Sequence, residues 1–171
     1  MAFDLQPHLS GELIELRPLR PGDWDELFAV ASDSLIWEQH PERDRCKEHI
    51  FKIFFREALE CGGAFAVIDS NIQQIIGSTR FYDYNPEKSE IEIGWTFLAQ
   101  KYWGGRCNRE MKDLQLGHAF EFVEKVIFLS ENKISAPKKR WKIGAIKIGM
   151  AARTCGHHPR AINVKFEVRK S

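Results

Sequence analysis

The chain has 171 residues, of which 43% are apolar and 12% aromatic. That is enough for one hydrophobic core and too little for two of comfortable size, so we expect a single domain spanning 1–171. The 25 basic and 24 acidic residues nearly cancel. This balance argues against a global field that would draw the chain to nucleic acid or to an acidic membrane surface, and DNA is not an expected partner.

Cysteine spacing and hydropathy indicate the compartment. Cys46, Cys61, Cys107 and Cys155 are scattered without a Cys-x-x-Cys pair, which argues against a disulfide framework or a cysteine-rich zinc site. The N-terminus lacks a basic stretch followed by an apolar run, and no segment approaches the roughly 18 apolar residues of a membrane span. We therefore expect a soluble, cytoplasmic protein that does not bind a membrane.

The first 60 residues predict one strand and two helices. Residues 12–16 alternate in polarity, and Pro18 and Pro21 end the strand. Asp23 and Glu26 form a predicted capping box for the first helix. The second helix is predicted over 44–60 and ends at a glycine pair, 62–63. Its apolar stripe has five members at helical spacing: Cys46, Ile50, Ile53, Phe54 and Ala58.

The remainder alternates between strands and helices. Strands over 64–69, 75–82 and 90–97 predict an antiparallel meander. A helix over 108–125, a strand over 126–129, another helix over 135–143 and a final strand over 162–168 follow. The inward side chains of the 108–125 segment are predicted to be Met111, Leu114, Ala119, Phe122 and Val123. This order indicates an α/β domain with a mixed, mostly antiparallel sheet and about four helices.

The most informative segment runs from Glu90 to Lys112, where a strand leads through Gly104 and Gly105 into an amphipathic helix. Glycines let the backbone approach a ligand closely, and the free N–H groups at a helix start favour a phosphate. A glycine pair by itself, however, more often marks an ordinary turn between a strand and a helix.

The full pattern resembles the GNAT acetyltransferase superfamily, especially the branch similar to the ribosomal-protein N-terminal alanine acetyltransferases. Its Tyr-Trp-Gly and Asn-x-Glu-x-x pattern is matched by residues 102–113. The family's Arg/Gln-x-x-Gly-x-Gly/Ala loop falls on 103–108, where Trp103, Arg106 and Asn108 replace the usual residues. A second block with Asn132 and Ser135 resembles the opening of the family's next helix.

The resemblance implies a GNAT-like fold in which two central strands splay apart and the pantetheine arm of acetyl-CoA pairs with backbone in the wedge between them. Residues 126–129 would form the second wall of this wedge. Arg106 is compatible both with a coenzyme phosphate contact and with a solvated position. The coenzyme-binding residues implied by the resemblance are Phe97, Leu98, Ala99, Trp103, Gly104, Gly105, Arg106, Cys107, Asn108 and Asn132.

Acetyl transfer to an amine requires the neutral amine, because a protonated nitrogen has no lone pair. Glu92 on the splayed strand is the candidate base, and Glu90 shares its face, so one of the two is expected to be only a surface carboxylate. Ser135 lies where related enzymes place a hydroxyl that protonates the departing thiolate, although it could equally be a helix cap.

The acceptor is expected to meet the first two helices and the last hairpin, where 36–41 is the most distinctive segment. Glu38 could bind a cationic amine. Trp37 and His40 are further substrate-binding candidates, although a tryptophan here is more often core and a histidine before proline is more often a loop residue. Cys155, His157 and His158 invite a metal interpretation, but a structural loop is favoured because no second cluster of ligands supports them.

A local basic stretch lies near the C-terminus of the chain. Its members are Lys133, Lys138, Lys139, Arg140, Lys142 and Lys147. The stretch is compatible with a solvated helix face, with attraction of the adenosine 3'-phosphate of the coenzyme and, less readily, with RNA.

These features predict an acetyl-CoA-dependent N-acetyltransferase that acts by direct attack in a ternary complex, as a monomer or homodimer. The acceptor is a primary amine, either a protein N-terminus or a small molecule. The alternative is a non-catalytic acyl-CoA-binding or RNA-associated module, which the altered glycine loop and the basic stretch leave open.

Overall fold

The computed structural model describes residues 2–38, 40, 42–131, 145–153 and 161–169. The strands are β1 (Leu9–Ser10), β2 (Ile14–Pro18), β3 (Ala64–Asp69), β4 (Gln74–Asn85), β5 (Glu90–Leu98), β6 (Lys125–Glu131), β7 (Ala145–Arg153) and β8 (Ala161–Arg169). The α-helices are α1 (Trp24–Ala31), α2 (Glu48–Glu60) and α3 (Arg106–Phe122), and short 3-10 turns cover Pro21–Asp23, Ser34–Trp37, Arg43–Cys46 and Gln100–Tyr102.

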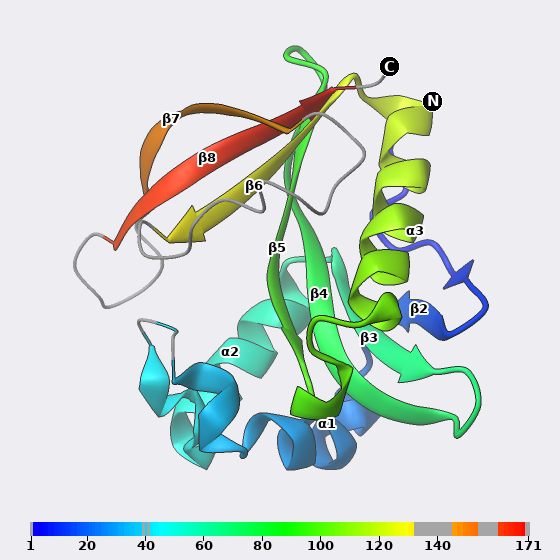
Figure 1. Cartoon of the computed structure of the whole chain (residues 1–171), viewed down its shortest axis with the longest axis vertical. Coiled ribbons are helices and arrows are strands. Elements are labelled where there is room, and N and C mark those ends of the chain that lie inside the picture. Colours follow the sequence, from blue (N-terminus) through cyan, green and yellow to red (C-terminus); the bar gives the residue numbers. More distant parts are fainter. Residues whose placement is uncertain (1, 39, 41, 132–144, 154–160, 170–171) are drawn as a thin grey trace.

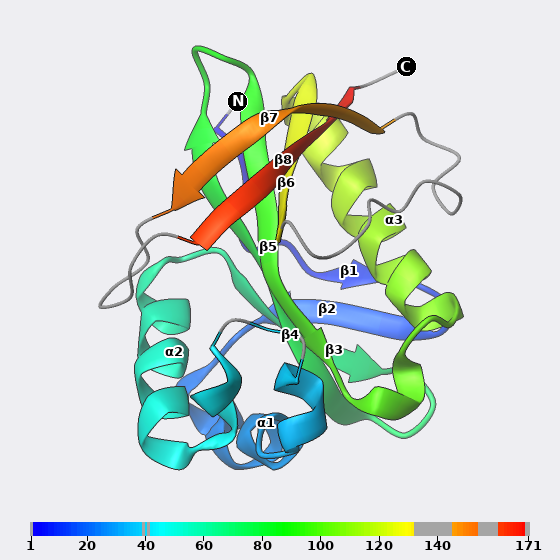
Figure 2. The same ribbon diagram turned by 60° about the vertical axis from the view of Figure 1, so that its left-hand side comes forward.

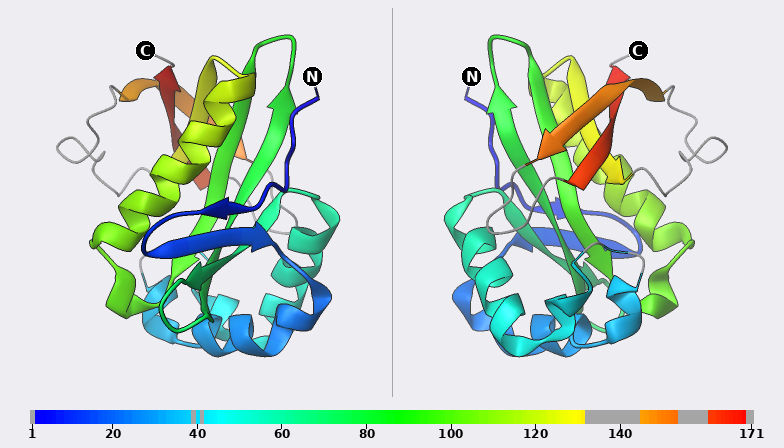
Figure 3. Two further views of the ribbon diagram at one scale, coloured as in Figure 1. Left: turned by 90° about the vertical axis from the view of Figure 1, so that its right-hand side faces the viewer. Right: turned by 90° about the vertical axis from the view of Figure 1, so that its left-hand side faces the viewer.

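The eight strands form one mixed sheet in the order β1-β2-β3-β4-β5-β6-β8-β7. Strands β5 and β6 are parallel, and the other neighbouring pairs are antiparallel. Helix α3 covers one face, whereas α1 and α2 lie against the other (Figures 1 and 3). The predicted α/β class and the predicted meander of β3, β4 and β5 are confirmed.

Two apolar clusters lie on opposite faces of the sheet. On the α3 side, Phe65 and Val67 of β3 pack with Met111 of the helix. On the other side, Ala66 of the same strand packs with Phe51 of α2. Because successive strand residues point to opposite faces, a strand covered on both sides is apolar throughout. This explains why β3 is buried from Ala64 to Ile68.

Helix α2 presents a different stripe from the predicted one. It begins at Glu48, after a 3-10 turn over Arg43–Cys46, and it ends before Gly62, whose φ of +66° suits glycine. Ile53, predicted to face inward, is 46% exposed. Phe54 and Ala58 are buried as predicted, and Phe51 and Phe55 complete the buried face. The aromatic rings bury more apolar area than the isoleucines would, and they therefore decide the orientation of the helix.

Helix α3 spans Arg106–Phe122 rather than 108–125, and its inward face is more polar than predicted. Met111 and Ala119 are buried as expected, but Leu114 and Phe122 are only partly buried. Lys112 and Gln115 are buried in addition. Apolar periodicity could not reveal these two positions, because both side chains are polar.

The two C-terminal strands agree with the predicted last hairpin, because β7 and β8 are antiparallel neighbours. The final strand, predicted over 162–168, lies within β8 and is confirmed. Strand β7 pairs with β8 from Ala145 to Arg153 and extends the sheet. The helix predicted over 135–143 falls outside the described residues. Within the described part of the chain, no helix is both long and apolar enough to cross a bilayer.

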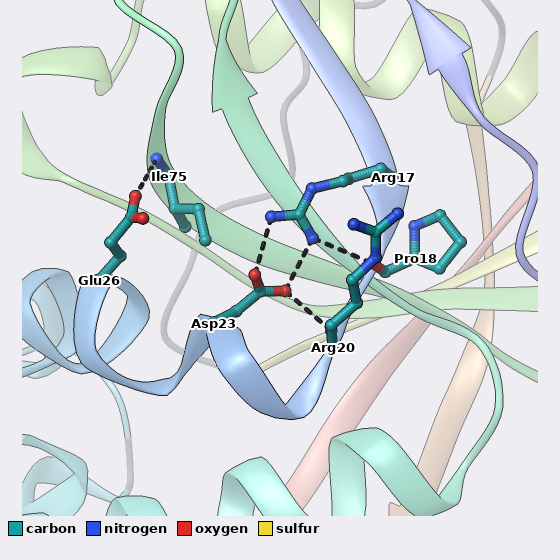
Figure 4. Close-up of polar contacts among 6 residues, drawn as sticks. All are labelled: Arg17, Pro18, Arg20, Asp23, Glu26 and Ile75. Carbon is teal, nitrogen blue, oxygen red and sulfur yellow. Dashed lines mark hydrogen bonds and ion pairs between the residues drawn. The ribbon is translucent and has the colours of Figure 1, made fainter.

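The capping box predicted for α1 is wrong, because both of its carboxylates have other partners (Figure 4). Asp23 accepts hydrogen bonds from Arg17 Nη1 and Nη2 at 2.8 and 2.7 Å and from the Arg20 N–H at 2.8 Å. Glu26 Oε2 accepts the Ile75 N–H at 3.3 Å. Burial raises the pKa of Asp23, but the bonds from Arg17 and Arg20 outweigh this and leave the pKa below its usual value.

Replacing Asp23 with Ala should lower the free energy of unfolding by about 3 kcal/mol, because the Arg17 guanidinium would lose its partner while remaining largely buried. Urea denaturation followed by circular dichroism measures the change. Asp25→Ala, at an exposed position on the same helix, is the matched control and should change the free energy of unfolding by less than about 1 kcal/mol. Equal losses in the two variants would contradict the importance of the Arg17–Asp23 pair.

Candidate active site

Strands β5 and β6 separate partway along their length. They pair only from Glu90–Lys125 to Ile93–Phe128, and beyond that point β6 continues against β8. Figures 1 and 2 show β6, β8 and β7 turning away from β5. Gly94 to Leu98 keep β4 on one side, but among the described residues no strand pairs with them on the β6 side. They therefore line an opening between β5 and β6. We call this opening the wedge, and it confirms the predicted splay of the two strands.

A β-bulge lies in β5 where the wedge begins. Arg80 pairs with Gly94 and Ser78 with Phe97, so two residues, Trp95 and Thr96, stand opposite Thr79 alone. Trp95 has φ of +50°, a left-handed conformation that is uncommon outside glycine and is often found at functional sites.

Glycine allows the close approach of the two strands beyond this bulge. A Cβ added at Gly77 of β4 would lie 2.0 Å from the Phe97 carbonyl oxygen. No other residue type fits this position without displacing β5.

The backbone of Leu98 faces the wedge. The Ala99 N–H donates to the Ile76 carbonyl at 2.8 Å, so Ala99 points toward β4. Because backbone groups alternate along a strand, the Leu98 N–H and C=O point to the other edge. The Leu98 carbonyl there accepts the Trp103 indole N–H at 2.8 Å. Of the predicted 97–99 stretch, Leu98 is therefore the residue whose backbone N–H and C=O point away from β4, toward the wedge.

Two aromatic side chains anchor the glycine loop. The Tyr102 hydroxyl donates to Asp69 Oδ2 at 2.6 Å, and burial together with this bond raises the pKa of Tyr102. Trp103 contacts the Leu98 carbonyl, so it is a loop anchor with a half-exposed ring. Gly104 adopts φ of +63°, and Gly105 caps α3 without a side-chain hydrogen bond. Gly105 has no side chain that could cap the first-turn N–H groups of α3, which makes this helix start suited to an anion.

The remaining loop positions differ in what they can offer a ligand. The Arg106 side chain is 78% exposed and its Nη2 lies 3.7 Å from Glu12 Oε2, a weak surface pair that a phosphate could replace. Burial, and then the charges of Asp69 and Glu110, raise the pKa of the Cys107 thiol. Cys107 is therefore a protonated thiol at neutral pH rather than a nucleophile. Asn108 is half-buried in the first turn of α3.

Glu110 has a structural role that sequence analysis missed. Its Oε2 accepts the Leu13 and Ile14 N–H groups at 2.8 and 2.9 Å, and Oε1 accepts the Glu12 N–H at 3.0 Å. A Cβ at Gly11 would lie 2.5 Å from the Glu110 carboxyl carbon, so glycine allows this approach. The carboxylate fixes α3 against the β1–β2 turn and so orients the helix start. The sequence signal that could have revealed this role is the position of Glu110 in the Asn-x-Glu pattern.

Glu92 lies beside the bulge on the α2 side of the sheet. Ile91 and Ile93 belong to the α3-side cluster, so alternation directs Glu92 to the other face. Its side chain is buried, and Oε1 lies 3.3 Å from where a Cβ at Gly94 would be. Glu90 lies at the far end of the strand, 3.8 Å from Lys125 Nζ. Of the two candidate bases, Glu92 is therefore the one beside the wedge.

Aromatic rings and arginines surround this face. Phe97 lies 5.0 Å from the Trp37 ring and 5.9 Å from the Phe54 ring, between ring centroids. Arg45 and Arg80 lie over the Phe54 ring, with their Cζ atoms at 4.9 and 4.5 Å from its centroid. Such contacts hold guanidinium groups against apolar surface. This face therefore combines apolar walls with cationic and acidic groups.

The predicted acceptor residues do not all point toward this face. Trp37 is 2% exposed, and its indole donates to the Ala31 carbonyl at 2.7 Å, which makes it a core residue beneath Phe97. Glu38 is exposed. His40 contacts Arg45 Nη1 through Nε2 at 3.1 Å. Burial, and then the Arg45 charge, lower the pKa of His40 to about 3, so its ring is neutral at pH 7.

Several predicted site residues cannot be placed. Asn132 and Ser135 fall in 132–144, and Cys155, His157 and His158 fall in 154–160, outside the described residues. The basic stretch falls there too, apart from Lys147 in β7. In the part of the chain that the structure describes, no three histidine, cysteine or acidic residues gather as metal ligands.

Lys112 is the other site residue that sequence analysis missed. It is 9% exposed, and its Nζ donates to Thr96 Oγ1 at 2.8 Å and to Gln115 Oε1 at 3.4 Å. The ammonium also lies 5.5 Å from the centroid of the Phe128 ring. No described carboxylate forms an ion pair with it. Burial lowers the pKa of Lys112 to about 7.

The wild-type protein should become more stable relative to Lys112→Met as the pH rises from about 7 to about 10. Between the folded pKa of about 7 and the ordinary lysine value near 10.5, the unfolded chain binds a proton that the folded chain lacks, and stability then increases with pH. Urea denaturation of both proteins at several pH values gives the difference between their free energies of unfolding. The contributions of titrating groups that both proteins share cancel in this difference. A difference independent of pH would show that Lys112 keeps an ordinary pKa.

A family model described as an acetyltransferase (GNAT) domain matches residues 14–143, most of the chain. A GCN5-related N-acetyltransferase from Brucella melitensis has a TM-score of 0.74 and 19% identity, over 96% of this chain and 79% of that one.

Two proteins from Vibrio cholerae also have similar structures. One, provisionally assigned as a ribosomal-protein-serine acetyltransferase, has a TM-score of 0.74 and 13% identity, over 99% of this chain and 100% of that one. A spermidine N-acetyltransferase solved with CoA and spermine has a TM-score of 0.58 and 18% identity, over 93% and 97%. Comparison with curated proteins gave no match. The family-model match, together with the bulged and splayed strands, shows that this chain belongs to the GNAT acetyltransferase family.

Proposed function

We propose that the protein binds acetyl-CoA in the wedge and transfers the acetyl group to a primary amine that approaches from the α2 side. The observation that carries this proposal is the bulge and divergence of β5 directly before the open start of α3. A strand edge with a free N–H suits an amide-containing chain, and a helix start suits a pyrophosphate. These two features follow one another along 94–108.

The coenzyme would contact mainly backbone. The Leu98 N–H, which points away from β4, can donate to a carbonyl of the pantetheine arm. The first-turn N–H groups after Gly105 can donate to phosphate oxygens, and Arg106 can add a charged contact. Because these donors belong mostly to the main chain, the unusual side chains at 103, 106 and 108 do not remove them. Asn132 remains a predicted contact to the pantetheine amide.

The chemistry requires removal of a proton from the amine. Glu92 can take this proton, directly or through a water molecule, because its carboxylate lies beside the bulge on the acceptor side. The amine nitrogen then forms a bond to the acetyl carbonyl carbon, and the carbon–sulfur bond breaks. The leaving sulfur takes up a proton and departs as the free thiol of CoA. Ser135 is the predicted donor of that proton.

The acceptor is proposed to be a protein N-terminal α-amine or a small amine. An α-amine has a pKa of about 8 and a lysine about 10.4, so at pH 7 roughly a tenth of the former and under a thousandth of the latter is neutral. Two proteins of similar structure carry names that point to these two acceptor classes, a ribosomal protein and spermidine. A larger fraction of an α-amine is already neutral at pH 7, so it depends less on proton removal by the Glu92 carboxylate than a lysine does.

Acetyl-CoA should raise the melting temperature, because a ligand at about 100 times its dissociation constant stabilises the folded state by roughly 2.7 kcal/mol. Arg106→Ala should raise the dissociation constant about threefold to tenfold through the lost phosphate contact. Arg109→Ala is the matched control on the same helix and should leave it within about twofold. No shift of the wild-type protein at millimolar acetyl-CoA would contradict the proposed coenzyme site.

Glu92→Gln should lower kcat about a hundredfold at pH 7 and leave acetyl-CoA affinity nearly unchanged, because the amide cannot accept the proton. Release of CoA thiol is measured against a panel of peptides with free N-termini and small amines. Glu90→Gln tests the strand position that shares its face and should retain most of the activity. If both variants keep wild-type rates on every active acceptor, Glu92 is not the base.

A further inference from the structure

We propose that the Thr96 hydroxyl contacts the bound coenzyme in the wedge and that Lys112 is the residue that positions this hydroxyl. The inference rests on the proposed function, because it assigns two further residues to the same site. Thr96 is the exposed member of the bulge pair, whereas Lys112 lies behind it on α3. One hydrogen bond of 2.8 Å joins them.

The hydrogen-bond network around Lys112 runs from the wedge into the core. Thr96 Oγ1 lies 2.8 Å from Thr79 Oγ1 on β4, and Thr79 donates to Gln115 Oε1 at 3.2 Å. Lys112 also reaches Gln115. Thr79 and Gln115 are fully buried, whereas Thr96 is exposed. A ligand in the wedge can therefore reach this network through the Thr96 hydroxyl.

The charge of Lys112 restricts which atoms of this network donate hydrogen bonds and which accept them. An ammonium group only donates, so it occupies a lone pair of Thr96 Oγ1 and of Gln115 Oε1. While the Thr79 proton is donated to Gln115, the Thr96 proton points to Thr79, and it can turn into the wedge when the Thr79 proton turns from Gln115 to Thr96. A carbonyl or sulfur of the coenzyme at the wedge wall would select the second orientation. A hydroxyl that receives a charge-assisted hydrogen bond is also the stronger donor.

Folding alone does not account for a lysine at this position. A buried ammonium without a carboxylate partner is costly, and Lys112 contacts only two neutral oxygens and the Phe128 ring among the described residues. The Gln115 Nε2 atom is buried and has no hydrogen-bond partner in the part of the chain that the structure describes. A methionine of similar length could keep the contact with the Phe128 ring. Residues that oppose stability in this way are expected at functional sites.

The decisive experiment compares activity with stability in Lys112→Met. The variant should unfold at a temperature equal to or above that of the wild-type protein, while kcat falls about tenfold or more and acetyl-CoA affinity stays within about threefold. Lys52→Met, at an exposed position on α2, is the matched lysine control and should keep wild-type kcat. Lys112→Met with kcat within about twofold of wild type would overturn the positioning role.

Changes at Thr96 test the contact itself. Thr96→Ser keeps the hydroxyl and should retain most of kcat, whereas Thr96→Val removes it and should lower kcat as much as Lys112→Met does. The double variant Lys112→Met/Thr96→Val should be no worse than either single variant, because both act through one contact. Additive losses would show that Lys112 acts elsewhere. Equal rates for Thr96→Ser and Thr96→Val would exclude the hydroxyl.

The pH dependence of kcat supplies a readout that packing alone would not change. The groups in contact with Lys112 Nζ, namely Thr96, Gln115 and Phe128, do not titrate. The wild-type profile should therefore contain an ionisation near pH 7 that Lys112→Met lacks, with the lysine active in its protonated form. Profiles of identical shape would contradict the role of the charge.

Hydrogen exchange separates this inference from the proposed function. The amides of 95–98 should exchange faster in Lys112→Met than in wild type without coenzyme, because Thr96 loses its anchor. If wild-type protein neither binds nor uses acetyl-CoA, the proposed function fails and so does the coenzyme contact of Thr96. If it does use acetyl-CoA while exchange and kcat are unchanged in Lys112→Met, only the present inference fails.

Discussion

One extra residue in β5 sets the geometry on which the site depends. Because Trp95 and Thr96 stand opposite Thr79 alone, the strand bends and loses its pairing with β6 beyond Ile93. The bend requires a left-handed Trp95 and a glycine at position 77 of the facing strand. The bent strand then continues through the glycine loop, so that a strand edge and a helix start face the same opening. A regular β5 would pair with β6 throughout and leave no wedge.

The two faces of this bent strand serve different purposes. On the α2 side, Glu92 is buried on the face that also carries Phe97 and Arg80, and we propose it as the base. On the α3 side, Thr96 is joined to Lys112 and through it to the core. The bulge shifts the alternation of side chains, so that Glu92 and Thr96, four residues apart on β5, lie on opposite faces of the sheet, with the cationic Lys112 of α3 behind Thr96. The separation of Glu92 and Lys112 by the sheet prevents them from neutralising each other by direct contact.

The site is held in place by contacts distant in sequence. The Glu110 carboxylate binds three backbone N–H groups at 12–14, and Tyr102 binds Asp69 of β3. These bonds orient the start of α3, so the backbone that we propose for phosphate binding is held in place by contacts within the chain. Trp103 and Cys107, which by position belong to the loop motif, contribute an anchor and a protonated thiol. The altered loop therefore keeps a main-chain cradle while its side chains have other partners.

The sequence by itself determined the α/β class, the β3 to β5 meander and the glycine-to-helix junction, because apolar periodicity and turn residues are local signals. The family was indicated separately, by the resemblance of the motifs at 102–113 and 132–135. Glu92 could also be named as a base candidate from its place on the strand. Tertiary structure decided which neighbour each polar group meets. Asp23 pairs with Arg17 instead of capping α1, Trp37 lies in the core, and Lys112 is buried. Periodicity assigns polar residues to the surface, and only the packing of α3 against the bulge shows that a lysine is enclosed there.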